Sequence, residues 1–278
     1  MTSTTRDVVA FARDVEIVAP LWQGSGEAGL GAGSRALAEW IVAEARRLTV
    51  PADEDGDSDD DDVRALSAVA AHLDAVRRTL GQLDPSRTLT LGGDCTVEVA
   101  PVSHLAARHP ELRVLWIDAH ADLNDPATSP SGLAHGMPLR LLLGDGHPDL
   151  LPATTLSPDR CALVGVRDID PAERELITRR DIAWFADPAS HEVATWLPAG
   201  APVYLHLDLD VLDPAIWPAV ALPTPRGSSV QELAALIAAV RERATLVGIG
   251  ITEYLPRAPH DLATLEPVFA ALGLTTTG

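Results

Sequence analysis

The chain has 278 residues, 40 acidic against 21 basic side chains, a formal net charge of −19 and only two cysteines. Such an acidic chain is a poor binder of nucleic acid or an anionic membrane, and two cysteines exclude a disulfide-stapled scaffold. No apolar run approaches the ~20 residues that cross a bilayer, and the amino-terminal sequence lacks a secretory pattern, so we expect a reduced, cytoplasmic protein.

Apolar runs with strand character alternate with runs at helical spacing in the first half of the chain. The predicted elements there are a strand at 14–22, a helix at 34–48, a helix at 66–80, a strand at 87–93, a helix at 97–108 and a strand at 112–118. Between the first two helices, the run DEDGDSDDDD at 53–62 predicts an acidic surface loop.

The same alternation continues in the second half. The predicted elements are strands at 160–166, 182–186, 202–210 and 246–254, with helices at 171–180 and 228–243. Ser229 and Glu232 form a capping box for the last of these helices. Alternating strands and helices predict an α/β protein with a mainly parallel sheet covered on both faces. With no internal repeat or linker, residues 1–278 are expected to form a single catalytic domain.

Polar clusters follow the apolar strands at the positions where those strands end. The clusters are GGDC, DAHAD, RDIDP, DLDVLDP and TEY. Active sites of parallel α/β proteins lie beyond the carboxyl ends of the strands. We therefore expect these clusters to meet in one site.

Two of the motifs place acidic and imidazole side chains at alternate positions: Asp118, His120 and Asp122, and then His206, Asp208 and Asp210. If the backbone stays extended, each set points to one side. Buried carboxylates are costly unless they are paired or bind a metal, and neither motif contains a basic side chain. Bonding to helix amino-terminal amides is the alternative, but the pattern favours two manganese-like ions that share carboxylates.

Cys95, in LTLGGDCT, stands at the mouth of a glycine turn. It could act as a metal ligand, as a nucleophile or as a small passive residue. A nucleophilic cysteine needs an electropositive setting, whereas neighbouring carboxylates raise a thiol's pKa. We favour the role of metal ligand. A thiolate ligand would shift the metal preference of the site towards zinc, cobalt or iron.

With these motifs the chain resembles the ureohydrolases, the family of arginase and agmatinase, over nearly its whole length. The resemblance rests on the Gly-Gly-Asp turn, Asp-Ala-His-x-Asp, a downstream His-Gly, Asp-x-Asp-x-x-Asp-Pro and a late glutamate. It implies a three-layer α/β/α sandwich and a hydrolase of linear amidines with a binuclear manganese site. It also implies a small guanidino substrate and a homo-oligomer.

The resemblance also implies roles for individual residues. One metal ion would be held by Cys95, Asp118, Asp122 and Asp208, and the second by His120, Asp118, Asp208 and Asp210. A hydroxide between the ions would be the nucleophile, with Asp122 hydrogen-bonded to it. His135 would carry protons, and Glu253 would pair with the guanidinium group.

Further matches concern the other end of the substrate. Asn124 and Ser131 match the residues that hold an α-carboxylate in arginases. Asp170, with Glu173 nearby, matches the segment that holds the α-amino group. The resemblance therefore implies an α-amino acid with a guanidino tail.

The chain departs from the family pattern in the site itself. Cys95 replaces a histidine ligand, Leu133 replaces an asparagine, Ala221-Leu222 replaces Gly-Thr, and His206 replaces a serine. His206 would either lie behind the ligands or be a core histidine bonded to backbone. Relatives with cysteine at this position resemble a branch that hydrolyses Nω-hydroxy-L-arginine to hydroxyurea and ornithine. Another guanidino acid as substrate, or a catalytically silent metal-binding relative, are the alternatives.

Overall fold

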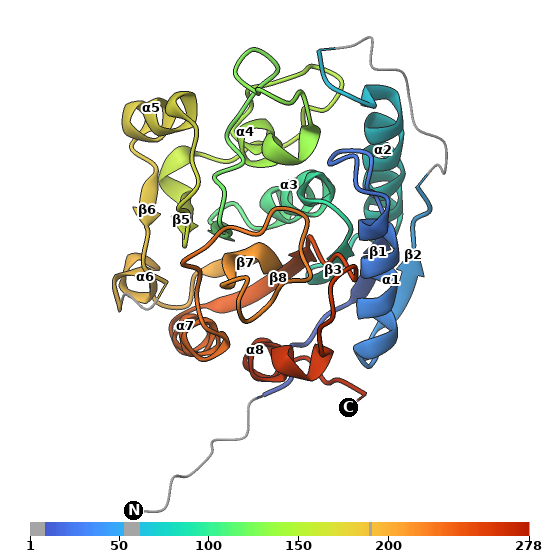
Figure 1. Ribbon diagram of the computed structural model, residues 1–278, viewed down its shortest axis with the longest axis vertical. Coiled ribbons are helices and arrows are strands. Elements are labelled where there is room, and N and C mark those ends of the chain that lie inside the picture. The colour runs from blue at the N-terminus through green and yellow to red at the C-terminus, as the bar shows by residue number, and fades with distance from the viewer. Residues whose placement is uncertain (1–8, 53–61, 189–190, 278) are drawn as a thin grey trace, which may run out of the picture.

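A computed structural model describes residues 9–52, 62–188 and 191–277 (Figure 1). Its strands are β1 (Val15–Ala19), β2 (Arg46–Thr49), β3 (Thr88–Gly92), β4 (Arg113–Ile117), β5 (Cys161–Val164), β6 (Ala183–Phe185), β7 (Pro202–Asp208) and β8 (Thr245–Thr252). They form an 8-stranded sheet in the order β2-β1-β3-β8-β7-β4-β5-β6, in which every pairing is parallel. The predicted mainly parallel sheet is confirmed.

Helices cover both faces of this sheet (Figure 1). One face carries α1 (Gly29–Trp40), α6 (His191–Trp196), α7 (Val230–Arg243) and α8 (Glu266–Leu272). The other carries α2 (Leu66–Leu83), α3 (Val99–Arg108), α4 (Pro138–Leu142) and α5 (Pro171–Arg180). Successive strand side chains point to opposite faces, so Leu115 and Ile117 pack in the first core and Val114 and Trp116 in the second. The three-layer α/β/α expectation is confirmed.

The capping box predicted at the start of α7 is present. Ser229 Oγ accepts a hydrogen bond from Glu232 N at 3.2 Å, and Glu232 Oε2 accepts one from Ser229 N at 2.8 Å. The two side chains satisfy amides that the first turn leaves unpaired. A local signal of this kind locates the helix start without help from the rest of the fold.

The helix predicted at 34–48 is wrong beyond Trp40. Ile41 is extended, with φ −84° and ψ 127°, and Arg46–Thr49 form the edge strand β2. Arg47 Nε donates to the buried carboxylate of Glu16 on β1 at 2.6 Å. A contact between neighbouring strands thus overrides helical spacing at this edge. The short helices α4, α6 and α8 were not predicted either.

The acidic surface loop predicted at 53–62 lies outside the described residues, apart from exposed Asp62. No helix in the described ranges is both long and apolar enough to cross a membrane. The polar clusters follow β3, β4, β5, β7 and β8, which are neighbours in the sheet. Their carboxyl ends therefore bring the clusters to one edge.

Candidate metal-dependent active site

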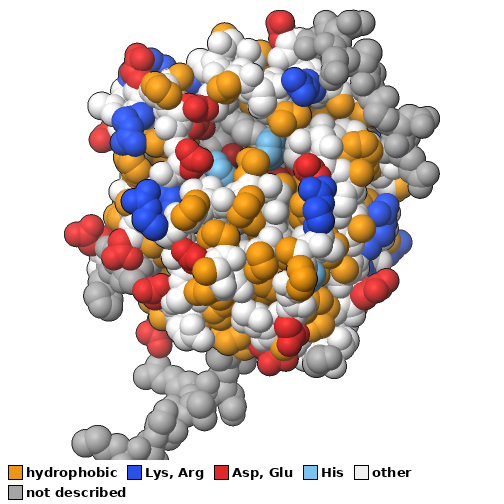
Figure 2. Space-filling model, in the orientation of Figure 1, with side chains coloured by type: hydrophobic (Ala, Val, Ile, Leu, Met, Phe, Trp, Pro, Cys, Tyr) orange, Lys and Arg blue, Asp and Glu red, His pale blue; other side chains and the backbone are white. Residues whose placement is uncertain are grey.

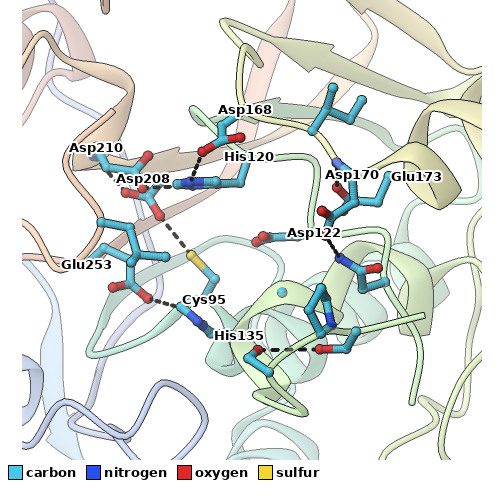
Figure 3. A pocket seen from close by; sticks show the side chains of 17 residues that line it. Cys95, His120, Asp122, His135, Asp168, Asp170, Glu173, Asp208, Asp210 and Glu253 are labelled. Atoms are coloured by element: carbon cyan, nitrogen blue, oxygen red, sulfur yellow. Dashed lines mark hydrogen bonds and ion pairs between the residues drawn. The ribbon is translucent and has the colours of Figure 1, made fainter. Parts of the chain in front are cut away.

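A pocket of about 220 Å³ opens at the carboxyl edge of the sheet. Figure 2 shows its mouth as a hollow with histidine and acidic side chains in its walls. The site residues predicted from the sequence line it (Figure 3), except Asp118, which is wholly buried. The predicted residues among those that line it are Cys95, His120, Asp122, Asn124, Ser131, His135, Asp170, Glu173, Asp208, Asp210 and Glu253.

The backbone turns at the end of each strand and does not stay extended as expected. Asp118 Oδ1 accepts a hydrogen bond from His120 N, and Asp208 Oδ1 accepts one from Asp210 N, both at 2.7 Å. Aspartate side chains stabilise turns by bonding to the backbone two residues on. Asp122 adopts a left-handed conformation, with φ +52°. The predicted one-sided alternation is therefore wrong beyond the strand ends, although the side chains still converge.

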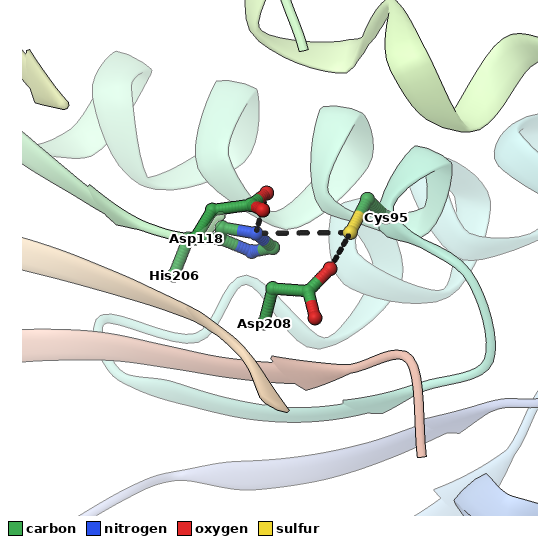
Figure 4. Close-up of side chains that lie close together, drawn as sticks. All are labelled: Cys95, Asp118, His206 and Asp208. Carbon is green, nitrogen blue, oxygen red and sulfur yellow. Dashed lines mark hydrogen bonds and ion pairs between the residues drawn. The ribbon is translucent and has the colours of Figure 1, made fainter. Parts of the chain in front are cut away.

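The converging side chains form two groups with the spacing of metal ligands. Cys95, Asp118, His206 and Asp208 each offer one atom within 4.8 Å of the others (Figure 4). Asp118, His120 and Asp210 form a second group of the same kind, so Asp118 is common to both. Asp122 belongs to neither group.

Cys95 lies at the floor of the pocket. Its thiol donates a hydrogen bond to Asp208 Oδ2 at 3.0 Å and lies 3.2 Å from the Thr252 hydroxyl. Burial raises the pKa of this thiol well above its ordinary value, and the charges of Asp208 and Asp122 raise it further. Without a cation beside it, the cysteine is a protonated, poorly nucleophilic thiol.

His120 bridges the second group. Its Nδ1 atom lies 3.0 Å from Asp210 Oδ2 and 3.5 Å from Asp118 Oδ1. Burial by itself lowers the pKa of His120, but the charge of Asp210 and the hydrogen bond to Asp118 outweigh it and raise the pKa. The two carboxylates therefore favour a positive charge at this ring, either a proton on His120 or a metal ion bound to it.

The donor set fits divalent ions. Asp118, Asp122, Asp208 and Asp210 are buried, and within the described ranges none forms an ion pair with an arginine. Burial raises the pKa of Asp208 first, and repulsion from Asp210 and Asp118 adds to it. Asp122 Oδ2 has no hydrogen-bond partner among the described residues. Buried carboxylates that repel one another and lack an arginine partner are suited to binding hard divalent cations.

His206 lies behind this pocket and is wholly buried. Its ring stacks on Trp116 with the centroids 3.6 Å apart, and Nε2 lies 3.6 Å from Asp118 Oδ2. Neither ring nitrogen bonds to backbone in the part of the chain that the structure describes. Of the two expectations for His206, the backbone-bonded core histidine is therefore wrong.

Glu98 is a site residue that the sequence reasoning missed. Its carboxylate is wholly buried, and Oε2 lies 3.6 Å from His206 Nδ1. The feature of the sequence that could have indicated Glu98 is its position three residues after Cys95. The two residues begin and end the short 3₁₀ turn Cys95–Glu98.

The pocket wall carries a histidine–glutamate pair. His135 Nδ1 lies 3.3 Å from Glu253 Oε1. Burial by itself lowers the pKa of His135, but the hydrogen bond and charge of Glu253 outweigh it and raise the pKa. The backbone N–H of Glu253, at φ +62°, donates to Gly93 O at 2.8 Å. This bond ties the turn after β8 to the glycine turn after β3.

Polar groups also lie at the outer end of the pocket. Asn124 Nδ2 donates to Asp170 Oδ2 at 3.0 Å. Glu173 accepts hydrogen bonds from the backbone N–H groups of Leu123 and Asp170, both at 2.9 Å. Glu173 thereby caps α5 and fixes the position of Asp170. Ser131 is exposed at the rim.

A buried carboxylate cluster at the carboxyl edge of an all-parallel sheet defines an α/β/α protein with a site suited to divalent metal ions. The family model described as "Arginase family" matches residues 18–271. The chain belongs to the arginase family.

Two solved structures and one curated relative show how close the likeness is. The arginase of Eremothecium gossypii is 34% identical over 224 residues, which cover 73% of this chain and 55% of the relative. The arginase structure from Bacillus subtilis has a TM-score of 0.78 at 26% identity, covering 94% of this chain and 98% of that one. The Entamoeba histolytica arginase structure, described as a complex with L-ornithine, has a TM-score of 0.83 at 22% identity, covering 96% and 99%. The chain thus spans little more than half the length of the Eremothecium gossypii relative.

Proposed function

We propose that this protein hydrolyses the guanidino group of arginine or of Nω-hydroxy-L-arginine, releasing ornithine with urea or with hydroxyurea. One observation carries the proposal: a floor of buried carboxylates and the His135–Glu253 pair line the same pocket. Relatives named arginase support the reaction class.

The proposed cofactor is a pair of divalent ions of the manganese type. Cys95, Asp118, Asp122 and Asp208 would hold one, and His120, Asp118, Asp208 and Asp210 the other. Bound divalent ions lower the pKa of water towards neutrality and so supply a nucleophile for hydrolysis. Asp122, whose Oδ2 atom is unpartnered among the described residues, provides the acceptor that orients the attacking water.

Glu253 and His135 act on the substrate's reacting end. The Glu253 carboxylate pairs with the cationic guanidinium and holds its planar carbon towards the pocket floor. When the carbon–nitrogen bond breaks, the leaving nitrogen must gain a proton. His135, whose pKa is raised by the hydrogen bond and charge of Glu253, is placed to supply that proton.

The outer end of the pocket would bind the α-amino acid group. Asp170 provides a carboxylate for the α-ammonium group, and the Asn124 amide and Ser131 hydroxyl face the α-carboxylate. Glu173 acts by holding Asp170 at the start of α5. A substrate without the α-amino acid group would offer no α-ammonium group to pair with the Asp170 carboxylate.

Cys95 favours the hydroxylated substrate. A thiolate adds negative charge to the site and weakens the acidity of a neighbouring metal ion. A hydroxyguanidine is less basic than a guanidine, so more of it is neutral near pH 7, and its hydroxyl group adds a contact. The hydroxylated substrate can therefore react at a metal ion of weaker Lewis acidity.

Ornithine release from L-arginine and from Nω-hydroxy-L-arginine, measured side by side in manganese-loaded and cobalt-loaded protein, tests the proposal. Release from the hydroxylated substrate alone supports a specialised site. Comparable release from arginine supports an arginase that tolerates Cys95. No ornithine from either substrate overturns the proposal. Agmatine, assayed by urea release, serves as the control, because it lacks the carboxylate that Asn124 and Ser131 would recognise.

A further inference from the structure

We propose that His206 is a metal ligand, and that it supplies, from strand β7, the imidazole for the ion bound beside Cys95. The inference rests on the proposed metal dependence, and it adds to that site a ligand from β7, whereas Cys95 lies in the 3₁₀ turn after β3. Glu98 is proposed as the residue that positions this ring.

The strand places the ring correctly. His206 and Asp208 are alternate residues of β7, so their side chains leave the same face of the sheet. On one side of His206, β4 presents Trp116, whose ring stacks on the imidazole with the planes inclined by 23°. The Trp116 Nε1–H donates to Asp118 Oδ2 at 3.1 Å. One tryptophan therefore fixes both His206 and Asp118.

On the other side of His206, β8 presents Gly250, which has no side chain and therefore leaves a space beside the ring. The Glu98 carboxylate fills it, because a Cβ atom added at Gly250 would lie 2.1 Å from its oxygens. Neither Glu98 oxygen has a hydrogen-bond partner among the described residues, although the side chain is wholly buried. His206 Nδ1 lies 3.6 Å from Glu98 Oε2.

This arrangement assigns the two ring nitrogens. Nδ1–H faces a carboxylate that lacks a donor, so the lone pair of Nε2 faces the pocket floor. Metal-bound histidines almost always donate their other N–H to a carboxylate, a carbonyl or water, which fixes the ring and its tautomer. His206 Nδ1 lies 3.6 Å from Glu98 Oε2, just beyond hydrogen-bonding distance, so the pair is placed to form that bond when the ring binds a metal ion.

The atoms around Nε2 have the spacing of a coordination sphere. Nε2 lies 3.6 Å from Asp118 Oδ2 and 3.8 Å from Cys95 Sγ, and Sγ lies 3.0 Å from Asp208 Oδ2 (Figure 4). Ligands that sit 2.0–2.3 Å from a tetrahedral ion are about 3.3–3.8 Å apart. Two of these three distances fall in that range, and all four atoms lie within 4.8 Å of one another, so one ion fits between them once the Cys95–Asp208 contact widens.

Asp122 lies outside this group of four but lines the same pocket as Cys95. Asp122 is only 5% exposed, its charge acts on Cys95, and its Oδ2 atom is unpartnered among the described residues. The donor set of sulfur, imidazole nitrogen and carboxylate oxygen suits zinc or cobalt better than manganese. A neutral imidazole also adds a ligand without adding to the negative charge of the cluster.

Cobalt binding tests the proposal without turnover. A cobalt–thiolate bond gives a near-ultraviolet charge-transfer band, so titration of this band reports only the ion at Cys95. His206→Gln should raise the Kd for that ion about tenfold or more, and Glu98→Gln should raise it about tenfold. His72→Gln is the matched control, because His72 is equally buried but lies on α2 beside Pro51. Its Kd should match that of the unaltered protein.

A Kd for His206→Gln within about twofold of the unaltered protein would overturn the proposal. A crystal structure of the unaltered, zinc-loaded protein covers the case in which the variant fails to fold. His206 Nε2 should lie about 2.0–2.1 Å from the ion that Cys95 binds. An ion at Cys95 without this bond, or no ion at Cys95, contradicts the inference. Both readouts stand even if no guanidino compound is hydrolysed, so they separate this inference from the proposed activity.

Discussion

Nδ1 of His135 and Oε1 of Glu253 lie 3.3 Å apart, although the residues are 118 positions apart in the sequence. The backbone N–H of His135 donates to Gly24 O at 3.1 Å, and that of Glu253 donates to Gly93 O at 2.8 Å. Two glycines therefore anchor the two ends of the pair. The contact links His135, which is proposed to supply a proton, to Glu253, which is proposed to bind the guanidinium cation.

Replacing Glu253 should change the titration of His135. Burial lowers the pKa of this ring, and the Glu253 carboxylate outweighs that effect. Glu253→Gln removes the charge, so the pKa of His135 should fall and the ring should lose its proton at a lower pH. NMR of the His135 ring during a pH titration measures the change. An unchanged pKa would show that Glu253 does not hold the proton there, and exposed Glu266→Gln is the control.

Cys95→His should raise turnover of arginine relative to Nω-hydroxy-L-arginine. The substitution replaces a thiol, which binds as an anion, by a neutral imidazole, and a nearby ion would then be a stronger Lewis acid. Steady-state assays with both substrates give the ratio. Increased hydroxyarginine turnover without a gain on arginine would show that the cysteine does not set specificity. Cys161→Ala, at the other buried cysteine, should leave the ratio unchanged.

Asp208→Asn should stabilise the metal-free protein and abolish stabilisation by metal. Asp208 is buried beside Asp118 and Asp210, which repel its charge. Removing that charge relieves the repulsion, whereas an ion at a hundred times its Kd stabilises the intact site by about 2.7 kcal/mol. Thermal unfolding with a chelator and with manganese measures both effects. A variant that is less stable without metal would contradict this account.

A buried ionic cluster at the other end of β1 should stabilise the fold. Glu16 is wholly buried and lies 2.6 Å from Arg13 and 2.6 Å from Arg47. Glu16→Gln leaves Arg47 without this anion and Arg13 with only Glu44, and it should cost about 3 kcal/mol in the free energy of unfolding. The exposed Glu175→Gln, which breaks the Arg179–Glu175 pair, should change it by less than about 1 kcal/mol. Urea unfolding of both variants tests the difference, and equal costs would contradict it.

The same cluster predicts a pH dependence. Burial by itself raises the pKa of Glu16, but the Glu44 backbone N–H and the two arginines outweigh it and lower the pKa. A lowered folded-state pKa means that this stabilisation is complete above the unfolded-state pKa and is lost as pH falls through the folded-state value. The stability difference between wild type and Glu16→Gln should therefore shrink in acid. A difference that is constant with pH would rule out this origin.

Local signals sufficed for much of the fold. The period of the apolar residues located α2, and the Ser229–Glu232 box located the start of α7, because both depend on neighbours in the chain. The edge strand β2 was mistaken for helix because Arg47 is held by Glu16, a contact between strands that no window of sequence contains.

The candidate site likewise has features that the local sequence predicts and features that depend on the assembled sheet. Strand ends marked by aspartates predicted which side chains would gather, since parallel strands finish at one edge. The turns that regroup these side chains, and the approach of Glu98 to His206 beside Gly250, depend on strand order and register. Those distances become available only when the sheet is assembled.

This pocket is proposed to hydrolyse guanidino groups with the help of bound metal. Ornithine release from both substrates should be measured in chelator-stripped protein and again after stepwise addition of manganese or cobalt, with metal content determined in the same samples. Stripped protein should release no ornithine, and activity should rise as two equivalents of metal bind. Full activity in stripped protein, or none from either substrate at any metal loading, would contradict this proposal.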